Sequence, residues 1–124
     1  MPSPVVLIVE DDANLRDVLA ETLKFEGYDA QVAANGLHAL ERLQHIDPPD
    51  VIVLDLMMPV MDGWGFRDAL RLMPAIRDVP VVVVSAMPPD QIGDLEAAAV
   101  LTKPVDFDHL IDTLRTLPQL RPHR

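Results

Sequence analysis

Three continuous runs of apolar, mostly β-branched residues constrain the fold of this chain most strongly. They lie at residues 5–9, 51–54 and 81–84. Continuous rather than alternating runs are typical of parallel strands that are covered on both faces. We expect two further strands, at residues 28–32 and near residues 99–102. Together these five segments predict a buried, mainly parallel sheet.

Segments with helical periodicity separate these runs. Leu15, Val18, Leu19 and Leu23 follow the i, i+3, i+4, i+8 spacing, and Gly27 stands where such a helix would end. This pattern predicts a helix between the first two strands.

Two later segments also predict helices. Asn35 and Gly36 can open one before the third strand, and a last helix is expected to begin after Asp106 as N-cap and to stop at Pro118. The resulting order is β-α-β-α-β-α-β-(short α)-β-α. Strands that alternate with helices predict right-handed crossovers and a doubly wound sheet, in which ligands bind beyond the carboxyl ends of the strands.

Length and composition limit the alternatives. We expect residues 1–124 to form one domain, with a core at about 5–117 and a polar tail, 118–124, that frays. A net charge of −10 argues against binding nucleic acid or anionic lipid, and the absence of cysteine excludes disulfides and thiolate chemistry. No stretch resembles a signal peptide or a membrane span, so a cytoplasmic protein is expected.

Chemically capable side chains follow four of the predicted strands. Glu10 and Asp11 end the first, Asp55 the third, Ser85 the fourth, and Lys103 the fifth. If the sheet is parallel, these residues converge at one edge. Carboxylates gathered there would repel one another unless a hard cation bound among them, most simply Mg²⁺, with Mn²⁺ as an alternative.

Such a site suits phosphoryl transfer. Asp55 can act as a carboxylate nucleophile, Lys103 can provide a charge for the phosphoryl oxygens, and Ser85 can donate a hydrogen bond. Each residue alone has a simpler explanation: a strand-end Asp is often a turn or cap residue, which we favour for Asp12, and a single lysine is usually on the surface. Only the joint placement favours a functional site.

The motifs resemble the receiver domain of two-component response regulators over about residues 5–117. They are "LIVEDD" (7–12), "VLDLMMPVMDGWG" (53–65), "VVVVSA" (81–86) and "LTKP" (101–104). The resemblance implies a flavodoxin-like (CheY-like) five-stranded parallel sheet of order 2-1-3-4-5. It also implies phosphorylation at an aspartate that binds Mg²⁺.

The resemblance assigns four residues to the metal. Asp11 matches the direct ligand and Glu10 the acid that acts largely through water. Asp55 matches the phosphoacceptor, which also binds the metal, and Met57 matches the position whose backbone carbonyl is a ligand.

Three further matches complete the pattern. Ser85 corresponds to the Ser/Thr that reports phosphorylation, and Lys103 to the lysine of the family, followed by a cis peptide bond to Pro104. Gly63 lies where the loop enters the third helix, and we expect it to supply backbone freedom there.

The sequence departs from the family pattern at two places that concern transmission of the phosphorylation signal. The interval 103 − 85 = 18 residues is shorter than the family pattern by about one helical turn and contains Pro88, Pro89 and Gly93. The fourth helix should therefore be short, irregular or absent. At Val100 many receivers have Tyr or Phe, so a rotamer switch there is not expected.

The leading hypothesis is a stand-alone receiver that accepts a phosphoryl group on Asp55 from a sensor histidine kinase or a histidine phosphotransfer protein. Its output would be protein contact, with a homodimer among the options and an effector that the sequence does not name. We expect slow self-phosphorylation and self-dephosphorylation rather than enzymatic turnover. Met57 and Met87, each two residues beyond a site residue, either slow hydrolysis of the phosphoryl group or simply fill space.

Two alternatives remain. Val100 and the depleted fourth helix favour a structural or dimerisation receiver that works without phosphorylation. A haloacid-dehalogenase-like phosphatase needs a second acid two residues after its nucleophile, where this chain has Met57. The sequence also leaves open whether the chain is a whole gene product or one receiver of a longer protein.

Overall fold

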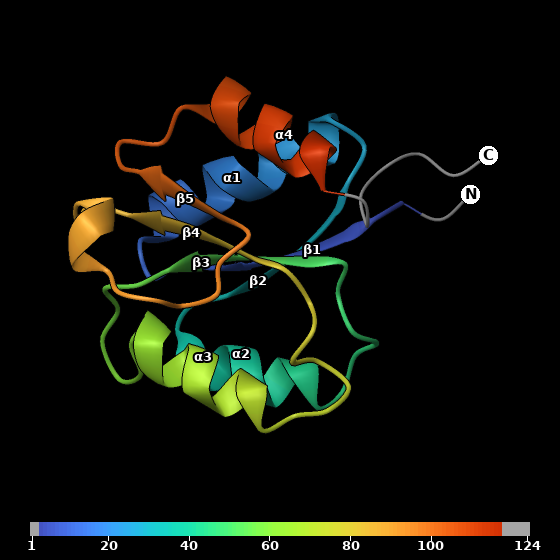
Figure 1. Ribbon diagram of the computed structural model, residues 1–124. Helices are drawn as coiled ribbons and strands as arrows, with labels where there is room; N and C mark the ends of the chain where they lie inside the picture. Colours follow the sequence, from blue (N-terminus) through green and yellow to red (C-terminus); the bar gives the residue numbers. More distant parts are fainter. Residues whose placement is uncertain (1–2, 118–124) are drawn as a thin grey trace.

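A five-stranded parallel sheet of order β2-β1-β3-β4-β5 organises the computed structural model, which describes residues 3–117 (Figure 1). The strands are β1 (Val5–Val9), β2 (Asp29–Ala33), β3 (Val51–Asp55), β4 (Val81–Ser85) and β5 (Ala99–Thr102). The helices are α1 (Ala13–Phe25), α2 (Gly36–Leu43), α3 (Gly63–Arg71) and α4 (Phe107–Thr116), with a 3₁₀ turn η1 (Pro89–Gln91). The predicted element order and sheet order are confirmed, with boundaries within one residue for every strand.

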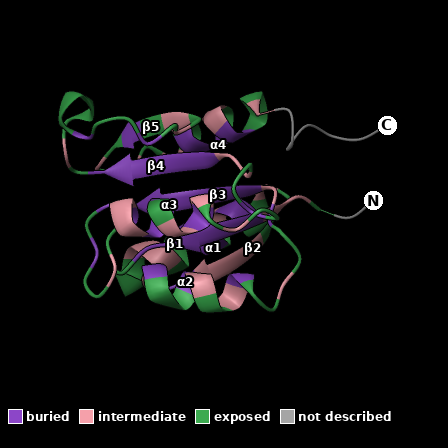
Figure 2. Cartoon of the chain, turned by 60° about the horizontal axis from the view of Figure 1, so that its bottom comes forward, coloured by how far each residue is buried: buried purple, intermediate pink, exposed green. Residues whose placement is uncertain are grey.

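The helices cover both faces of the sheet, α1 and α4 on one side and α2 and α3 on the other (Figure 1). Successive residues of β1 and β3 point to opposite faces and join two separate apolar clusters. Every residue of β3 and β4 is buried (Figure 2). This two-sided burial is why the strands read as continuous apolar runs. Within residues 3–117, no helix is long and apolar enough to cross a membrane.

Side-chain caps begin the helices as the sequence indicated. Asp12 accepts hydrogen bonds from the N–H groups of Asn14 and Leu15 at the start of α1, and Asn35 and Asp106 cap α2 and α4. Gly27, at φ +97°, follows the last turn of α1. The expected stop at Pro118 and the tail 118–124 lie outside the described residues.

The segment between β4 and β5 contains no α-helix, as its prolines predicted. Only η1 forms, because Pro88 and Pro89 have no N–H to donate and Gly93 adopts φ +83°. Ile92 and Leu95 nevertheless insert into the core on the side of α2 and α3. The segment therefore packs against the core through two buried side chains, although no α-helix forms between β4 and β5.

The expected reason for Gly63 was wrong. Gly63 does not adopt a left-handed conformation; that role in the loop falls to the exposed Val60, at φ +71°. Gly63 is instead required for space, since a Cβ atom there would lie 2.7 Å from the Cα of Leu56 and 3.0 Å from the carbonyl oxygen of Asp55. The start of α3 thus packs directly against the end of β3.

Replacing Gly63 with Ala should lower the free energy of unfolding by about 1–3 kcal/mol, because the added methyl group meets backbone atoms that cannot move aside. Urea denaturation measures the effect. Gly65→Ala is the matched control: its Cβ would meet nothing closer than 3.4 Å, so it should be neutral or slightly stabilising in the helix. Equal stability of Gly63→Ala and the wild type would contradict this explanation.

Candidate functional site

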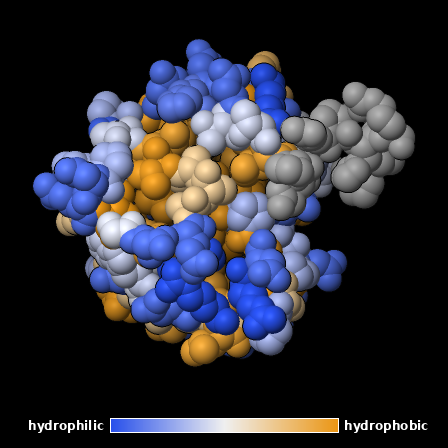
Figure 3. Space-filling model, viewed as in Figure 1, coloured by the Kyte–Doolittle hydropathy of each residue, from blue (hydrophilic) through white to orange (hydrophobic). Residues whose placement is uncertain are grey.

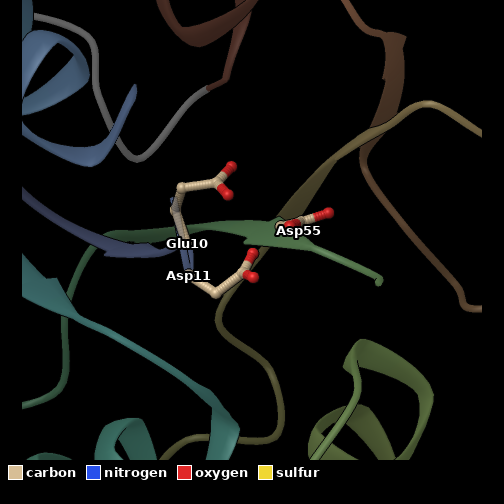
Figure 4. A group of neighbouring side chains, drawn as sticks. All are labelled: Glu10, Asp11 and Asp55. Carbon is tan, nitrogen blue, oxygen red and sulfur yellow. The ribbon is translucent and has the colours of Figure 1, made fainter. Parts of the chain in front are cut away.

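The carboxyl ends of four strands bring the predicted site residues together. Glu10 and Asp11 follow β1, Asp55 and Ser85 end β3 and β4, and Lys103 follows β5. One carboxylate oxygen from each of Glu10, Asp11 and Asp55 lies within 4.8 Å of the others. Figure 4 shows these three side chains gathered at the ends of β1 and β3.

Lys103 contacts two of the three acids. Its Nζ lies 3.1 Å from Oε1 of Glu10 and 3.4 Å from Oδ2 of Asp55. Both carboxylates are almost completely buried, at 2% and 4% exposure. The Lys103–Pro104 peptide bond is cis, as expected.

Backbone and side-chain hydrogen bonds hold Glu10 in place. Its Oε2 accepts from the N–H of Asp12 at 3.2 Å, and its carbonyl accepts from Nη1 of Arg16 at 3.0 Å. Asp11, in contrast, is exposed. Glu10 is thus bonded to protein partners, whereas the side chain of Asp11 is exposed; the metal-binding roles that the resemblance implies for them stay predictions.

The remaining contacts orient Asp55 and Ser85. Oδ1 of Asp55 accepts from the N–H of Met57 at 3.2 Å, and Met57 is 57% exposed. Ser85 is fully buried, and its Oγ accepts from the N–H of Met87 at 3.1 Å. Met87 packs partly buried against the core, so the space-filling explanation fits Met87 and not Met57.

Electrostatics perturb both charged partners. Burial, and then the charge of Glu10, raises the pKa of Asp55 to about 7, although Lys103 opposes this shift. Burial alone would lower the pKa of Lys103, but its hydrogen bond to Glu10 and the charges of Asp55 and Glu10 raise it instead. Lys103 is therefore held as a cation, while Asp55 resists ionisation in the absence of a metal.

The donor set fits a hard divalent cation. Three carboxylates face one ammonium group, which leaves an excess negative charge that Mg²⁺ would neutralise. All the side-chain ligands are oxygen atoms, which Mg²⁺ prefers over the softer transition metals. Glu10, Asp11, Asp55 and the carbonyl of Met57 are the residues that would hold it.

Sequence reasoning missed part of the surroundings. Arg67 in α3 is only 6% exposed, and burial, followed by the charge of Arg71, lowers its pKa. Its position between Phe66 and Leu70, on the same face as the apolar stripe of α3, was the available signal. Trp64 packs against the core and donates its indole N–H to the carbonyl of Ile92 at 3.0 Å.

The histidines play no part in this pocket among the described residues. His38, His45 and His109 are exposed, and His123 lies outside the described residues.

The structure is thus a doubly wound α/β domain. The carboxyl edge of its sheet holds an acidic pocket, a lysine and a buried serine. The sequence pattern of the response regulator receiver domain matches residues 6–115. The chain belongs to this family of receiver domains of two-component response regulators.

Several proteins of known sequence or structure are similar to it. The transcriptional regulatory protein PrrA of Mycobacterium tuberculosis is 38% identical over 96% of this chain and 52% of PrrA. The transcriptional regulator RpaA of Synechocystis is 33% identical over 92% of this chain and 48% of RpaA. The chain therefore spans about half the length of these curated relatives.

Solved structures support the same fold. The chemotaxis response regulator CheY4 of Vibrio cholerae has a TM-score of 0.85 at 30% identity, covering 92% of this chain and 98% of CheY4. The receiver domain of the sensor histidine kinase PA1611 from Pseudomonas aeruginosa has a TM-score of 0.80 at 26% identity, covering 92% and 96%. That structure has a magnesium ion in its active-site cleft.

The raised pKa of Asp55 predicts a pH-dependent stability. Between about pH 4 and pH 7 the folded state retains a proton that the unfolded state has released, so the free energy of unfolding falls as pH rises through this window. Asp55→Asn removes the charge and should stabilise the metal-free protein by about 1–3 kcal/mol at pH 8, and much less at pH 5. Urea titrations at both pH values measure the difference. An equal difference in stability between Asp55→Asn and the wild type at pH 5 and pH 8 would contradict the raised pKa of Asp55.

Proposed function

We propose that Asp55 accepts a phosphoryl group from a sensor histidine kinase or a histidine phosphotransfer protein in a Mg²⁺-dependent reaction. The observation that carries this proposal is the contact of Lys103 with both Asp55 and Glu10, beside the exposed carboxylate of Asp11. An aspartate that needed only to cap a turn would not require a buried ion pair.

The transfer follows from the positions of these side chains. A carboxylate oxygen of Asp55 attacks phosphorus, the P–O bond forms, and the P–N bond to the donor imidazole breaks. The donor ring, protonated on its other nitrogen, leaves as neutral imidazole. Mg²⁺, when bound, would keep Asp55 ionised and offset the charge of the phosphoryl oxygens.

Lys103 and Ser85 would then bind the transferred group. Nζ of Lys103 already lies 3.4 Å from Oδ2 of Asp55, so it can pair with a phosphoryl oxygen once that carboxylate has become an acyl phosphate. Ser85 Oγ accepts one hydrogen bond from Met87 and keeps its own O–H free to donate. This makes the domain a phosphoacceptor with slow chemistry of its own rather than a turnover enzyme.

The output would be a protein contact in the cytoplasm, where a sensor kinase presents its phosphohistidine. Hydrophobic residues gather in the middle of the face shown in Figure 3, between hydrophilic surfaces over α4 and over α3. β5 is an edge strand of the sheet, and its residue Val100 is 36% exposed. A homodimer is the second candidate, since the same apolar surface could pair with another copy.

Acetyl phosphate with Mg²⁺ should add the mass of one phosphoryl group to the protein. Intact-mass spectrometry detects it, and removal of Mg²⁺ with a chelator should abolish it. Asp55→Asn is the control and should gain no mass. An unmodified wild type would reject the phosphoacceptor role and favour the structural receiver.

Met57→Asn should shorten the lifetime of the phosphoryl group several-fold. The exposed thioether of Met57 offers an incoming water no strong hydrogen bond, whereas an amide would orient it. Loss of phosphoryl mass over time measures the rate. Val60→Asn, in the same loop and 78% exposed, is the control and should leave the lifetime unchanged. Identical lifetimes for Met57→Asn and the wild type would remove the idea.

A further inference from the structure

The segment of residues 86–98 links the site to α3 and has little structure of its own. At its start, the N–H of Met87 donates to Oγ of Ser85 at 3.1 Å. Beyond the short turn η1, its carbonyl groups have no helix to satisfy them. They need partners from elsewhere in the fold.

Side chains of α3 supply these partners. The indole N–H of Trp64 donates to the carbonyl of Ile92 at 3.0 Å, and Nε of Arg67 donates to the carbonyl of Leu95 at 2.9 Å. Arg71, one turn further along α3, forms an ion pair with the same segment. The spacing i, i+3, i+7 places all three donors on one face of the helix. We call Trp64, Arg67 and Arg71 the α3 clamp.

The clamp closes on a strained residue. Nη2 of Arg67 donates to the carbonyl of Glu96 at 3.3 Å, and Nη2 of Arg71 lies 3.1 Å from Oε1 of Glu96. Glu96 adopts φ +54°, a conformation that side-chain-bearing residues seldom take. Nη1 of Arg67 is buried and has no hydrogen-bond partner among residues 3–117. The closed clamp is thus held at a cost, which is typical of an element that can open.

The helix that bears the clamp is fixed to the strand of Asp55. The N–H of Gly63 donates to the carbonyl of Leu56 at 2.8 Å, and no room remains there for even a methyl group. One end of the 86–98 segment is therefore bonded to Ser85, and the other is clamped to a helix that is packed closely on the end of β3.

We propose, on the basis of the proposed function, that the α3 clamp opposes filling of the Asp55 site and is loosened when the site is filled. In this mechanism Ser85 turns toward a group on Asp55 to donate a hydrogen bond to it, and the bond from the N–H of Met87 to Ser85 Oγ draws Met87 along. Only residues 88–91 separate Met87 from the clamped Ile92. Inward movement of Ser85 therefore pulls on the clamp.

This device replaces a rotamer switch at Val100. Val has no ring to turn inward, and Val100 is partly exposed on β5. Release of the clamp would instead change the surface formed by α3 and residues 92–96. A partner protein that binds only when the Asp55 site is filled would then recognise the changed surface.

Thermodynamic linkage makes the idea testable, because a clamp that opposes occupancy must, when weakened, favour it. Arg67→Leu should raise the affinity for beryllofluoride with Mg²⁺ about fivefold or more, measured by ¹⁹F NMR titration. Trp64→Phe keeps a ring but removes the indole donor, and should shift the affinity in the same direction by less. Arg77→Leu, the same change at an exposed arginine outside the clamp, should leave the affinity unchanged.

Hydrogen exchange gives an independent measurement on the wild type. Beryllofluoride should speed exchange of the amides of residues 92–98 about tenfold or more, while the amides of α2 keep their rates. Unchanged or lower affinity in the clamp variants, or unchanged exchange at 92–98, would overturn the clamp mechanism. If Arg67→Leu does not fold, Trp64→Phe decides the matter. A wild type that binds no beryllofluoride would instead reject the proposed function itself.

Discussion

The contact of Lys103 with two buried carboxylates is the interaction on which the functional edge depends. Glu10 directly follows β1 and Asp55 ends the adjacent parallel strand β3, so their backbone positions are set by the sheet and not by their mutual repulsion. Burial of two like charges is unfavourable unless a cation compensates them. Lys103 compensates part of the charge, but burial, and then the charge of Glu10, still raises the pKa of Asp55. The site is therefore prepared for a further cation rather than complete in itself.

The apolar core explains how this strain is tolerated. β3 and β4 are buried along their whole lengths, and α3 packs so tightly on the end of β3 that Gly63 has no space for a side chain. A rigid scaffold prevents Asp55 from relaxing away from its neighbours. The same rigidity directs any adjustment to the segment after Ser85, which has no α-helix and no strand of its own and only the short turn η1.

Strands and site residues could be predicted from the sequence because their signals are local. Continuous apolar runs define buried parallel strands, and a polar residue directly after a run lies at the sheet edge. Asp12 and Asp106 were recognised as caps for the same reason. The role of Arg67 was not local, since its acceptors, Leu95 and Glu96, lie 28 and 29 residues away in a segment without periodicity. The steric reason for Gly63 was also missed, because a close approach of two segments produces no recognisable pattern in the sequence of either segment.

The absence of an α-helix between β4 and β5 and the presence of a buried arginine in α3 have one physical explanation. Pro88, Pro89 and Gly93 prevent the segment from pairing its own carbonyl groups, so those groups would be left unsatisfied beside an apolar core. An arginine offers several donors in a fixed geometry and can satisfy more than one carbonyl at once. A leucine at position 67 would fill the space but bind none of them. Arg67 thus couples the shape of the 92–96 segment to α3 through polar bonds, and polar bonds are more easily exchanged than packed apolar surface when the neighbouring site changes its charge.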